Sequence, residues 1–106
     1  MNFEKTLERI KDLTEKQLKN PEENTGTIVL HLLEELGEFS TAVCIEDGSD
    51  VKGYKELDES SSKEALDMVI CVFSLYFDRG GSKSEILSYM NKKMDKWEKN
   101  IKSEID

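Results

Sequence analysis

Residues 27–46 read TIVLHLLEELGEFSTAVCIE, and residues 64–77 read EALDMVICVFSLYF. Both runs are mostly apolar, and each is long enough to form a helix. Acidic residues nevertheless occur inside both runs, and burying a charge without a partner is costly. The acidic residues whose place in an apolar run must be explained are Glu34, Glu35, Glu38 and Asp67, together with Glu64 where the second run begins.

The spacing of these acids places them on shared helix faces. Each residue advances about 100° around a helix, so Glu34, Glu35 and Glu38 fall within one arc about 100° wide. Glu64 and Asp67 are three residues apart and share a face of the second helix. In an antiparallel hairpin, one register places Glu35 opposite Asp67. The same register places Glu38 opposite Glu64, so four or five carboxylates converge between two facing helices.

Such a cluster requires protons, cationic partners or metal ions, because uncompensated burial of each charge costs several kcal/mol. The expected donors are all oxygen atoms, and almost no His or Cys lies nearby, which suits a hard cation. Mg²⁺ is the expected ion and Mn²⁺ is an alternative. Because protein-bound Mg²⁺ usually keeps several waters and shares phosphate oxygens, the sequence points to phosphate chemistry.

Length and charge restrict the class of protein. The chain has 106 residues, which predicts a single domain spanning residues 1–106. It contains one Pro and six Gly, and long stretches of good helix formers predict an all-α fold. The formal net charge of −8 argues against binding to nucleic acid or to an anionic membrane, since both require a basic surface.

The cysteines and the first residues indicate the compartment. The hairpin register separates Cys44 from Cys71 by roughly 20 Å along the axis, too far for a disulfide within one chain. Reduced thiols in a cytoplasmic protein are therefore expected. Residues 1–13 are charged and amphipathic and lack the apolar centre of a signal peptide. No segment reaches the about 18 uninterrupted apolar residues of a membrane span.

Helical periodicity predicts two helices in the first half of the chain. Apolar residues recur at helical spacing over residues 3–18. Residues 20–23, Asn-Pro-Glu-Glu, look like a helix start, with a cap residue, Pro at the first helical position and acids in the first turn. The second helix is expected over about residues 27–46. The charged, glycine-containing segment 47–59 predicts a loop after it.

Two further helices are predicted after that loop. The third begins near residues 60–62 and continues to residues 76–78, where Arg79-Gly80-Gly81 ends it. The fourth follows Ser82 and carries an apolar stripe at three- and four-residue spacing, formed by Leu87, Met90, Met94, Trp97 and Ile101.

The second and third helices are apolar around most of their circumference. Two flanking helices from one short chain can hardly cover such surfaces. The sequence therefore predicts a bundle completed by homo-oligomerisation, as a homodimer or a homotetramer.

The acidic pattern resembles a family signature. Residues 34–38, EELGE, are followed after 25 residues by residues 64–67, EALD. This resembles the MazG-like nucleoside triphosphate pyrophosphohydrolases, an all-α family that pairs an E-E-x-x-E stretch on one helix with an E-x-x-D stretch on the next. The amphipathic helix before, the acidic loop between and the Lys-rich helix after are also similar. The resemblance implies a four-helix all-α domain with a central antiparallel hairpin.

The resemblance also implies an activity: Mg²⁺-dependent hydrolysis of a (deoxy)nucleoside triphosphate to the monophosphate and pyrophosphate, in nucleotide-pool cleansing. It implies metal ligands at Glu35, Glu38, Glu64 and Asp67. It further implies catalytic roles for Glu38 and for Glu34, the latter as an additional acid that binds a further ion or orients the attacking water. The expected phosphate-binding residues are Lys92, Lys93 and Lys96, with the choice among the helix-four lysines left open.

Simpler interpretations stand beside these. The acids could form a solvated acidic face, and Glu64 could be the capping-box partner of Ser61 at the start of the third helix. His31 is expected as a packing residue and Trp97 as a core or interface residue. The aromatic residues at the end of the third helix are expected in the core or a dimer contact, with a nucleobase pocket as the alternative; they are Phe73, Tyr76 and Phe77.

Two other functional classes would also use acidic residues on helices. A carboxylate-bridged di-iron bundle needs a Glu-x-x-His pair on each of two helices, and this chain has one His in total. A non-catalytic helical interaction module would use the acidic groove to bind a basic partner. A requirement for Mg²⁺ at the groove would separate the enzyme from this module.

Overall fold

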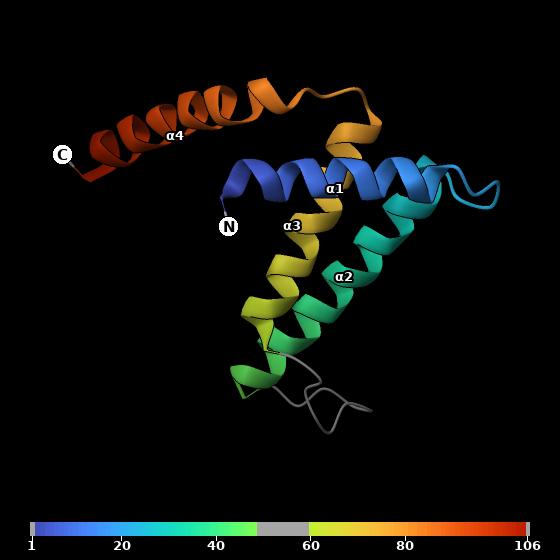
Figure 1. The fold of residues 1–106 in the computed structure, drawn as a ribbon. Coiled ribbons are helices and arrows are strands. Elements are labelled where there is room, and N and C mark those ends of the chain that lie inside the picture. The colour runs from blue at the N-terminus through green and yellow to red at the C-terminus, as the bar shows by residue number, and fades with distance from the viewer. Residues whose placement is uncertain (1, 49–59, 106) are drawn as a thin grey trace.

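The computed structural model describes residues 2–48 and 60–105. These residues form four helices, and no strand occurs among them, so the predicted all-α class is confirmed (Figure 1). None of the described helices has the length and apolarity needed to cross a membrane. The helices are α1 (Phe3–Leu18), α2 (Thr25–Glu46), α3 (Ser61–Asp78) and α4 (Lys83–Ile105).

The start of α2 differs from the sequence expectation. Residues 20–23 form turns, so the helix start predicted there is wrong. Asn24 is the N-cap: its side chain accepts a hydrogen bond from the Thr27 backbone N–H at 3.1 Å, and the Thr27 hydroxyl accepts one from the Asn24 N–H at 2.9 Å. This reciprocal pair satisfies two backbone donors at once, which Pro and acidic residues at 21–23 cannot do.

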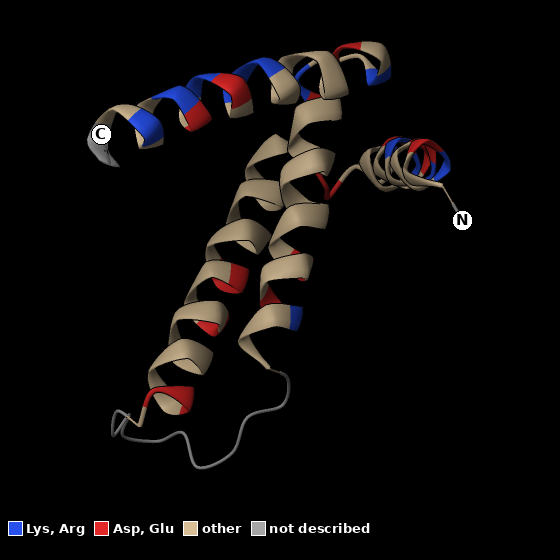
Figure 2. Ribbon diagram, turned by 90° about the vertical axis from the view of Figure 1, so that its left-hand side faces the viewer, with Lys and Arg blue, Asp and Glu red and all other residues tan. Residues whose placement is uncertain are grey.

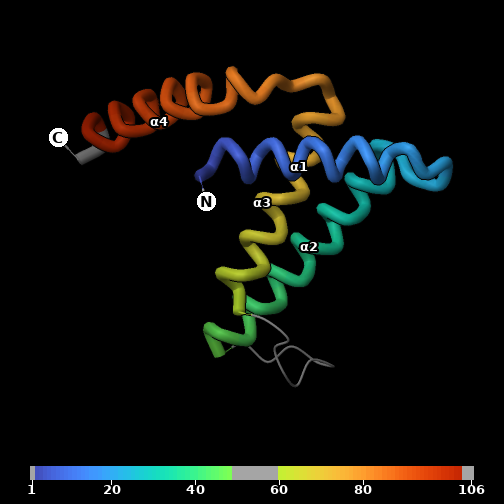
Figure 3. Tube along the Cα trace, in the orientation of Figure 1, coloured from blue at the N-terminus to red at the C-terminus, as the bar shows by residue number. Residues whose placement is uncertain are grey.

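The two central helices pack side by side and run in opposite directions (Figures 1 and 3). We call α2 and α3 together the hairpin. Ile28 and Ala42 of α2 are buried, which fits positions that face another helix. The antiparallel arrangement is the one from which the register of the acids was predicted. Most of the segment predicted as a loop, residues 49–59, lies outside the described residues.

The first helix crosses one side of α3. Leu7 of α1 is 2% exposed, and the buried Thr14 hydroxyl lies 2.7 Å from the hydroxyl of Ser74 on α3. Phe3 and Phe73 meet edge to face with ring centroids 6.0 Å apart. An apolar contact and a buried polar contact therefore fix α1 on α3.

A tight turn between α3 and α4 sets the direction of α4. Gly80 has a φ of 88°, a conformation that glycine adopts without steric cost. Gly81 lies against the ring of Tyr76, whose hydroxyl donates to the Ser82 carbonyl at 2.7 Å. The Lys83 ammonium at the start of α4 lies near two acids of α1, Glu4 at 4.0 Å and Glu8 at 3.7 Å.

Beyond this turn α4 extends away from the hairpin (Figure 1). Among the described residues, α4 approaches α1, and its backbone does not come close to α2 or α3. Trp97 is 64% exposed, so it is not a core residue within this chain. The other half of the expectation, that Trp97 lies in an interface, stays a prediction. The radius of gyration is 17.1 Å, whereas a compact domain of this length has about 13 Å. The buried apolar core is correspondingly small: Leu7, Ile28, Ala42 and Ile86.

Candidate metal centre

Three carboxylates meet on the hairpin. Glu35 of α2 and Glu64 and Asp67 of α3 each offer an oxygen, and these oxygens lie within 4.8 Å of one another. Glu64 is buried, and the other two side chains are half-buried. The register predicted from the sequence is the reason they meet, since helical spacing brings Glu64 and Asp67 to one face and antiparallel packing brings Glu35 to them.

Glu64 is the most enclosed of the three. It lies in the first turn of α3 and is 7% exposed, and its Oε2 atom is buried without a hydrogen-bond partner. Its backbone N–H donates to the carbonyl of Ser60, the N-cap residue, which makes no side-chain cap. The helix thus begins one residue earlier than a capping box with Ser61 requires, so the capping interpretation of Glu64 fails.

The electrostatic surroundings of Glu64 are unfavourable for its charge. Burial, followed by the negative charges of Glu38 and Glu35, raises the pKa of Glu64 above its ordinary value. A hydrogen bond between the Glu38 and Glu64 side chains and the charge of Asp67 raise this pKa further. Removing a carboxylate from water and surrounding it with like charges both disfavour ionisation. A cation bound beside these carboxylates would favour the ionised form of Glu64.

Glu38 and Glu34 lie at the edge of the centre. Glu38 interacts with Glu64, as the register predicts, but its side chain is exposed and it is not among the three carboxylates that share the 4.8 Å group. Glu34 is exposed and lies beside His31 on the same helix, with Nδ1 3.9 Å from Oε2. The structure therefore brings Glu38 next to the cluster and leaves Glu34 outside it. His31 is exposed, and the expectation that it packs in the interior is wrong.

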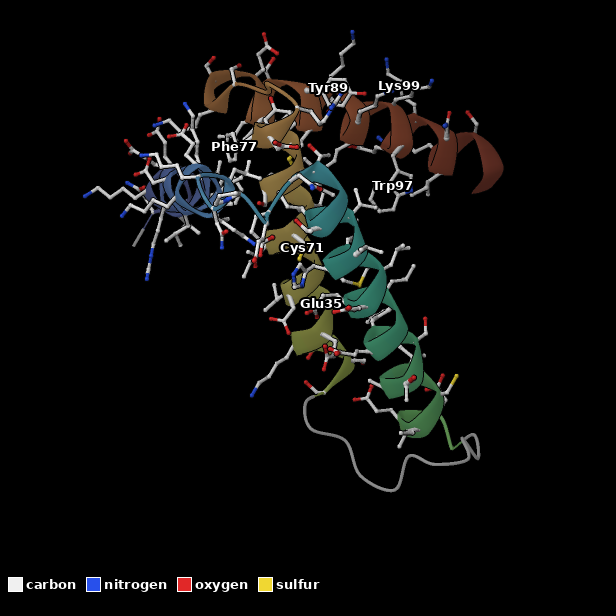
Figure 4. The ribbon with its side chains drawn as sticks, turned by 90° about the vertical axis from the view of Figure 1, so that its right-hand side faces the viewer. Glu35, Cys71, Phe77, Tyr89, Trp97 and Lys99 are labelled. Atoms are coloured by element: carbon white, nitrogen blue, oxygen red, sulfur yellow. The ribbon has the colours of Figure 1, made fainter. Side chains whose placement is uncertain are left out.

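Cys71 of α3 is a neighbour of the centre. Partial burial, then the charges of Glu35 and Asp67, raise the pKa of the Cys71 thiol, which favours the neutral form. Figure 4 shows Cys71 and Glu35 close together along the hairpin. The sequence could have indicated that Cys71 lies near the carboxylates, because it follows Asp67 by one helical turn. Both cysteines, Cys44 and Cys71, are free.

The predicted phosphate-binding lysines lie elsewhere in this chain. Lys92, Lys93 and Lys96 are exposed residues of α4, and the Lys93 ammonium lies 5.5 Å from the centre of the Tyr89 ring. Figure 2 shows lysines and acids alternating along α4, while acids predominate on the hairpin. Because α4 does not approach α2 or α3, a single chain does not bring these lysines to the carboxylates.

The donor set fits a hard divalent cation. Among the described residues, no Lys or Arg forms an ion pair with Glu64 or Asp67, so no cationic side chain there balances their charge. The buried Glu64 Oε2 atom is an oxygen without a hydrogen-bond partner, and the three donors are all carboxylates. Such a set suits Mg²⁺ or Mn²⁺ better than Zn²⁺ or Cu⁺, which favour nitrogen and sulfur ligands.

Comparison with known proteins adds no relative: no protein-family model, no curated protein and no solved structure matches this chain. The resemblance to the MazG-like family therefore stays a prediction from the motifs.

Proposed function

We propose that this protein is a Mg²⁺-dependent nucleoside triphosphate pyrophosphohydrolase of the MazG-like kind. It would hydrolyse a (deoxy)nucleoside triphosphate to the monophosphate and pyrophosphate, in nucleotide-pool cleansing. The observation that supports this proposal is the cluster of Glu35, Glu64 and Asp67 on an antiparallel hairpin. These acids belong to the two motifs on which the resemblance rests, and they lie together across two helices.

Each carboxylate has a proposed task. Glu35, Glu64 and Asp67 hold the Mg²⁺ ion, and Glu38 contributes from its position beside Glu64. When bound, Mg²⁺ supplies charge neutralisation for the triphosphate and lowers the pKa of a bound water. Mn²⁺ would suit the same oxygen donors.

The proposed reaction is attack of water on the α-phosphorus. A bond forms between the water oxygen and the α-phosphorus, and the bond from that phosphorus to the α–β bridging oxygen breaks. Pyrophosphate leaves with the electron pair. Glu38 is the proposed acceptor of the water proton, since its side chain is exposed and lies beside the cluster. Glu34, one turn away along α2, is the additional acid that orients the water or binds a further ion.

The proposed active form is a homo-oligomer, either a homodimer or a homotetramer. Sixteen large apolar side chains of the described residues are at least 40% exposed, which is unusual for a monomer of this size. Lys92, Lys93 and Lys96 remain the candidates for binding phosphate oxygens. Because α4 lies apart from its own hairpin, these lysines would approach the substrate from another copy.

Substitution of Asp67 tests the proposal. Asp67→Asn removes one ligand charge without changing side-chain size, so Mn²⁺ affinity should fall by about tenfold or more, and hydrolysis should fall with it. Asp12→Asn on the exposed surface of α1 is the matched control and should change neither. Calorimetric titration with Mn²⁺ and measurement of pyrophosphate release check both results. Unchanged Mn²⁺ affinity in Asp67→Asn would show that the metal site lies elsewhere.

A further inference from the structure

The distal part of α4 has no covering surface in the described chain. Residues 87–103, which we call the arm, are all exposed, although the residue just before them, Ile86, is buried. The arm nevertheless carries large apolar side chains at helical spacing. Those that are at least 40% exposed are Leu87, Tyr89, Met90, Met94, Trp97 and Ile101.

Five of these six side chains form one stripe along the arm, and Tyr89 lies outside it. Leu87, Met94 and Trp97 fall within about 80° of one another around the helix, and Lys99 lies on the opposite side. Figure 4 shows Trp97 on the side of α4 toward which the hairpin extends, and Lys99 on the other side. An amphipathic helix gains most of its stability from packing its apolar face, so this stripe indicates a docking surface.

The arm cannot reach its own hairpin in the observed geometry. The ion pairs of Lys83 with α1 and the hydrogen bond from Tyr76 to Ser82 hold the beginning of α4 at the end of α3. From that anchor the arm extends away from α2 and α3 (Figures 1 and 3). The described residues of this chain therefore supply no partner surface for the arm.

Both helices of the hairpin carry exposed apolar side chains. Eight large aliphatic side chains on α2 and α3 are between 40% and 63% exposed, and none of them belongs to the carboxylate cluster. We call them the hairpin surface. They are Val29, Leu30, Leu33, Leu36, Leu66, Val69, Ile70 and Val72.

The charges of the two elements are complementary. The arm contains five lysines and two acidic residues, whereas α2 and α3 together contain one lysine and seven acidic residues. The arm is thus a basic element in a chain whose net charge is −8. Figure 2 shows this contrast between α4 and the hairpin. Opposite charges at the margin of an apolar contact favour arm-to-hairpin pairing over arm-to-arm or hairpin-to-hairpin pairing.

The accessible area is large enough for a stable dimer. The chain exposes 8490 Å², whereas a folded monomer of 12.2 kDa exposes about 6,000 Å². The excess is more than the about 800 Å² per partner that a stable interface buries. A second copy of this chain supplies both missing surfaces at once, because it carries an arm and a hairpin of its own.

We propose that two copies of the chain exchange arms, with the arm of each packed on the hairpin surface of the other. This inference rests on the homo-oligomer proposed above and specifies how its copies pack, and its tests measure mass and not hydrolysis. A two-fold symmetric pair contains two equivalent arm-to-hairpin contacts.

The first test places a charge in the arm stripe. Wild-type protein is expected to sediment at a mass of at least two chains, and Trp97→Asp is expected to sediment as a monomer. The matched control is Ser88→Asp, which adds the same charge on the opposite side of the helix and should keep the wild-type mass. The circular dichroism spectrum of Trp97→Asp should remain that of a helical protein, because Trp97 contributes little to packing within the chain.

The second test distinguishes exchanged arms from other dimers. Leu33→Asp places a charge in the hairpin surface and should also produce a monomer. In an equimolar mixture of Trp97→Asp and Leu33→Asp, the intact arm of one variant meets the intact hairpin of the other, so one of the two contacts is restored. The mixture is therefore expected to form heterodimers at concentrations where each variant alone is monomeric.

Three results would overturn the proposal. Wild-type protein could sediment as a monomer at micromolar concentration. Trp97→Asp could keep the wild-type mass, which would show that the arm is not in the interface. Both variants could be monomeric and stay monomeric when mixed, which would indicate a contact between like surfaces in place of exchanged arms.

Discussion

At the scale of single residues, Glu64 is a buried carboxylate that lies among other carboxylates. Its side chain is 7% exposed and interacts with three other carboxylates, Glu38, Glu35 and Asp67. Each of these effects disfavours the ionised form, so the metal-free centre costs stability at neutral pH. A site that is unfavourable when empty and composed of oxygen donors is the pattern expected of a cation site.

The raised pKa of Glu64 predicts how stability depends on pH in metal-free protein. Because the pKa is raised on folding, the folded state binds more protons between the ordinary glutamate pKa and the raised one. The contribution of Glu64 is therefore fully present below the ordinary value and is lost as the pH rises through the raised value. Glu64→Gln should remove this dependence.

Urea unfolding between about pH 4 and pH 8, in the presence of chelator, measures the effect. The free energy of unfolding of Glu64→Gln, relative to wild type, is expected to increase as the pH rises. A difference that stays constant across this range would contradict the assignment of the pKa shift to Glu64.

Glu38 provides a separate prediction, because it lies beside the cluster and is exposed. If Glu38 accepts the proton of the attacking water, Glu38→Gln should lower kcat by about a hundredfold or more. Its Mn²⁺ affinity should fall less than that of Asp67→Asn, because the Glu38 oxygens are outside the 4.8 Å group. Steady-state kinetics and Mn²⁺ titration on the same samples give both quantities. Equal losses of affinity in the two variants would make Glu38 a full ligand.

At the scale of helices, the sequence predicts well which segments are helical, and it predicts less well the residues at which each helix begins and ends. The spans of α1 and α3 agree with the periodicity of their apolar residues, because these positions face other helices. The helix α2 begins at Thr25, two residues before the expected start, because the reciprocal cap between Asn24 and Thr27 sets its first turn. The register of Glu35 with Asp67 was predictable because helical spacing and antiparallel packing both constrain it.

Gly81 and Gly37 differ in the space that is available for an added methyl group. A Cβ at Gly81 would collide with the ring of Tyr76, whereas a Cβ at Gly37 has nothing within 4 Å. Gly81→Ala should therefore destabilise the protein by about 1–3 kcal/mol and loosen the anchor of α4. Gly37→Ala, inside α2, should stabilise it by about 0.5–1 kcal/mol.

Thermal or urea unfolding of both glycine variants provides the measurement. The expected signs are opposite, so each variant serves as the control for the other. A stabilised Gly81→Ala variant would show that Tyr76 moves away at no cost and that its ring does not hold the turn.

At the scale of the whole molecule, the position of α4 could not be predicted from the sequence. The stripe that contains Met94 and Trp97 predicts an apolar contact, but periodicity does not say which surface receives it. In the structure the stripe is exposed, and the core within one chain is small. The same exposure leaves the three candidate lysines away from the carboxylates of their own chain.

We propose that the hairpin carboxylates support metal-dependent hydrolysis of a nucleoside triphosphate at the α-phosphorus. The first experiment is product analysis in ¹⁸O-labelled water, using a panel of ribo- and deoxynucleoside triphosphates with Mg²⁺, with Mn²⁺ or with chelator. At least one substrate is expected to give monophosphate and pyrophosphate, chelator is expected to abolish the reaction, and the ¹⁸O is expected in the monophosphate. Turnover that persists in chelator, release of inorganic phosphate with a diphosphate, or no turnover of any substrate would contradict the proposal.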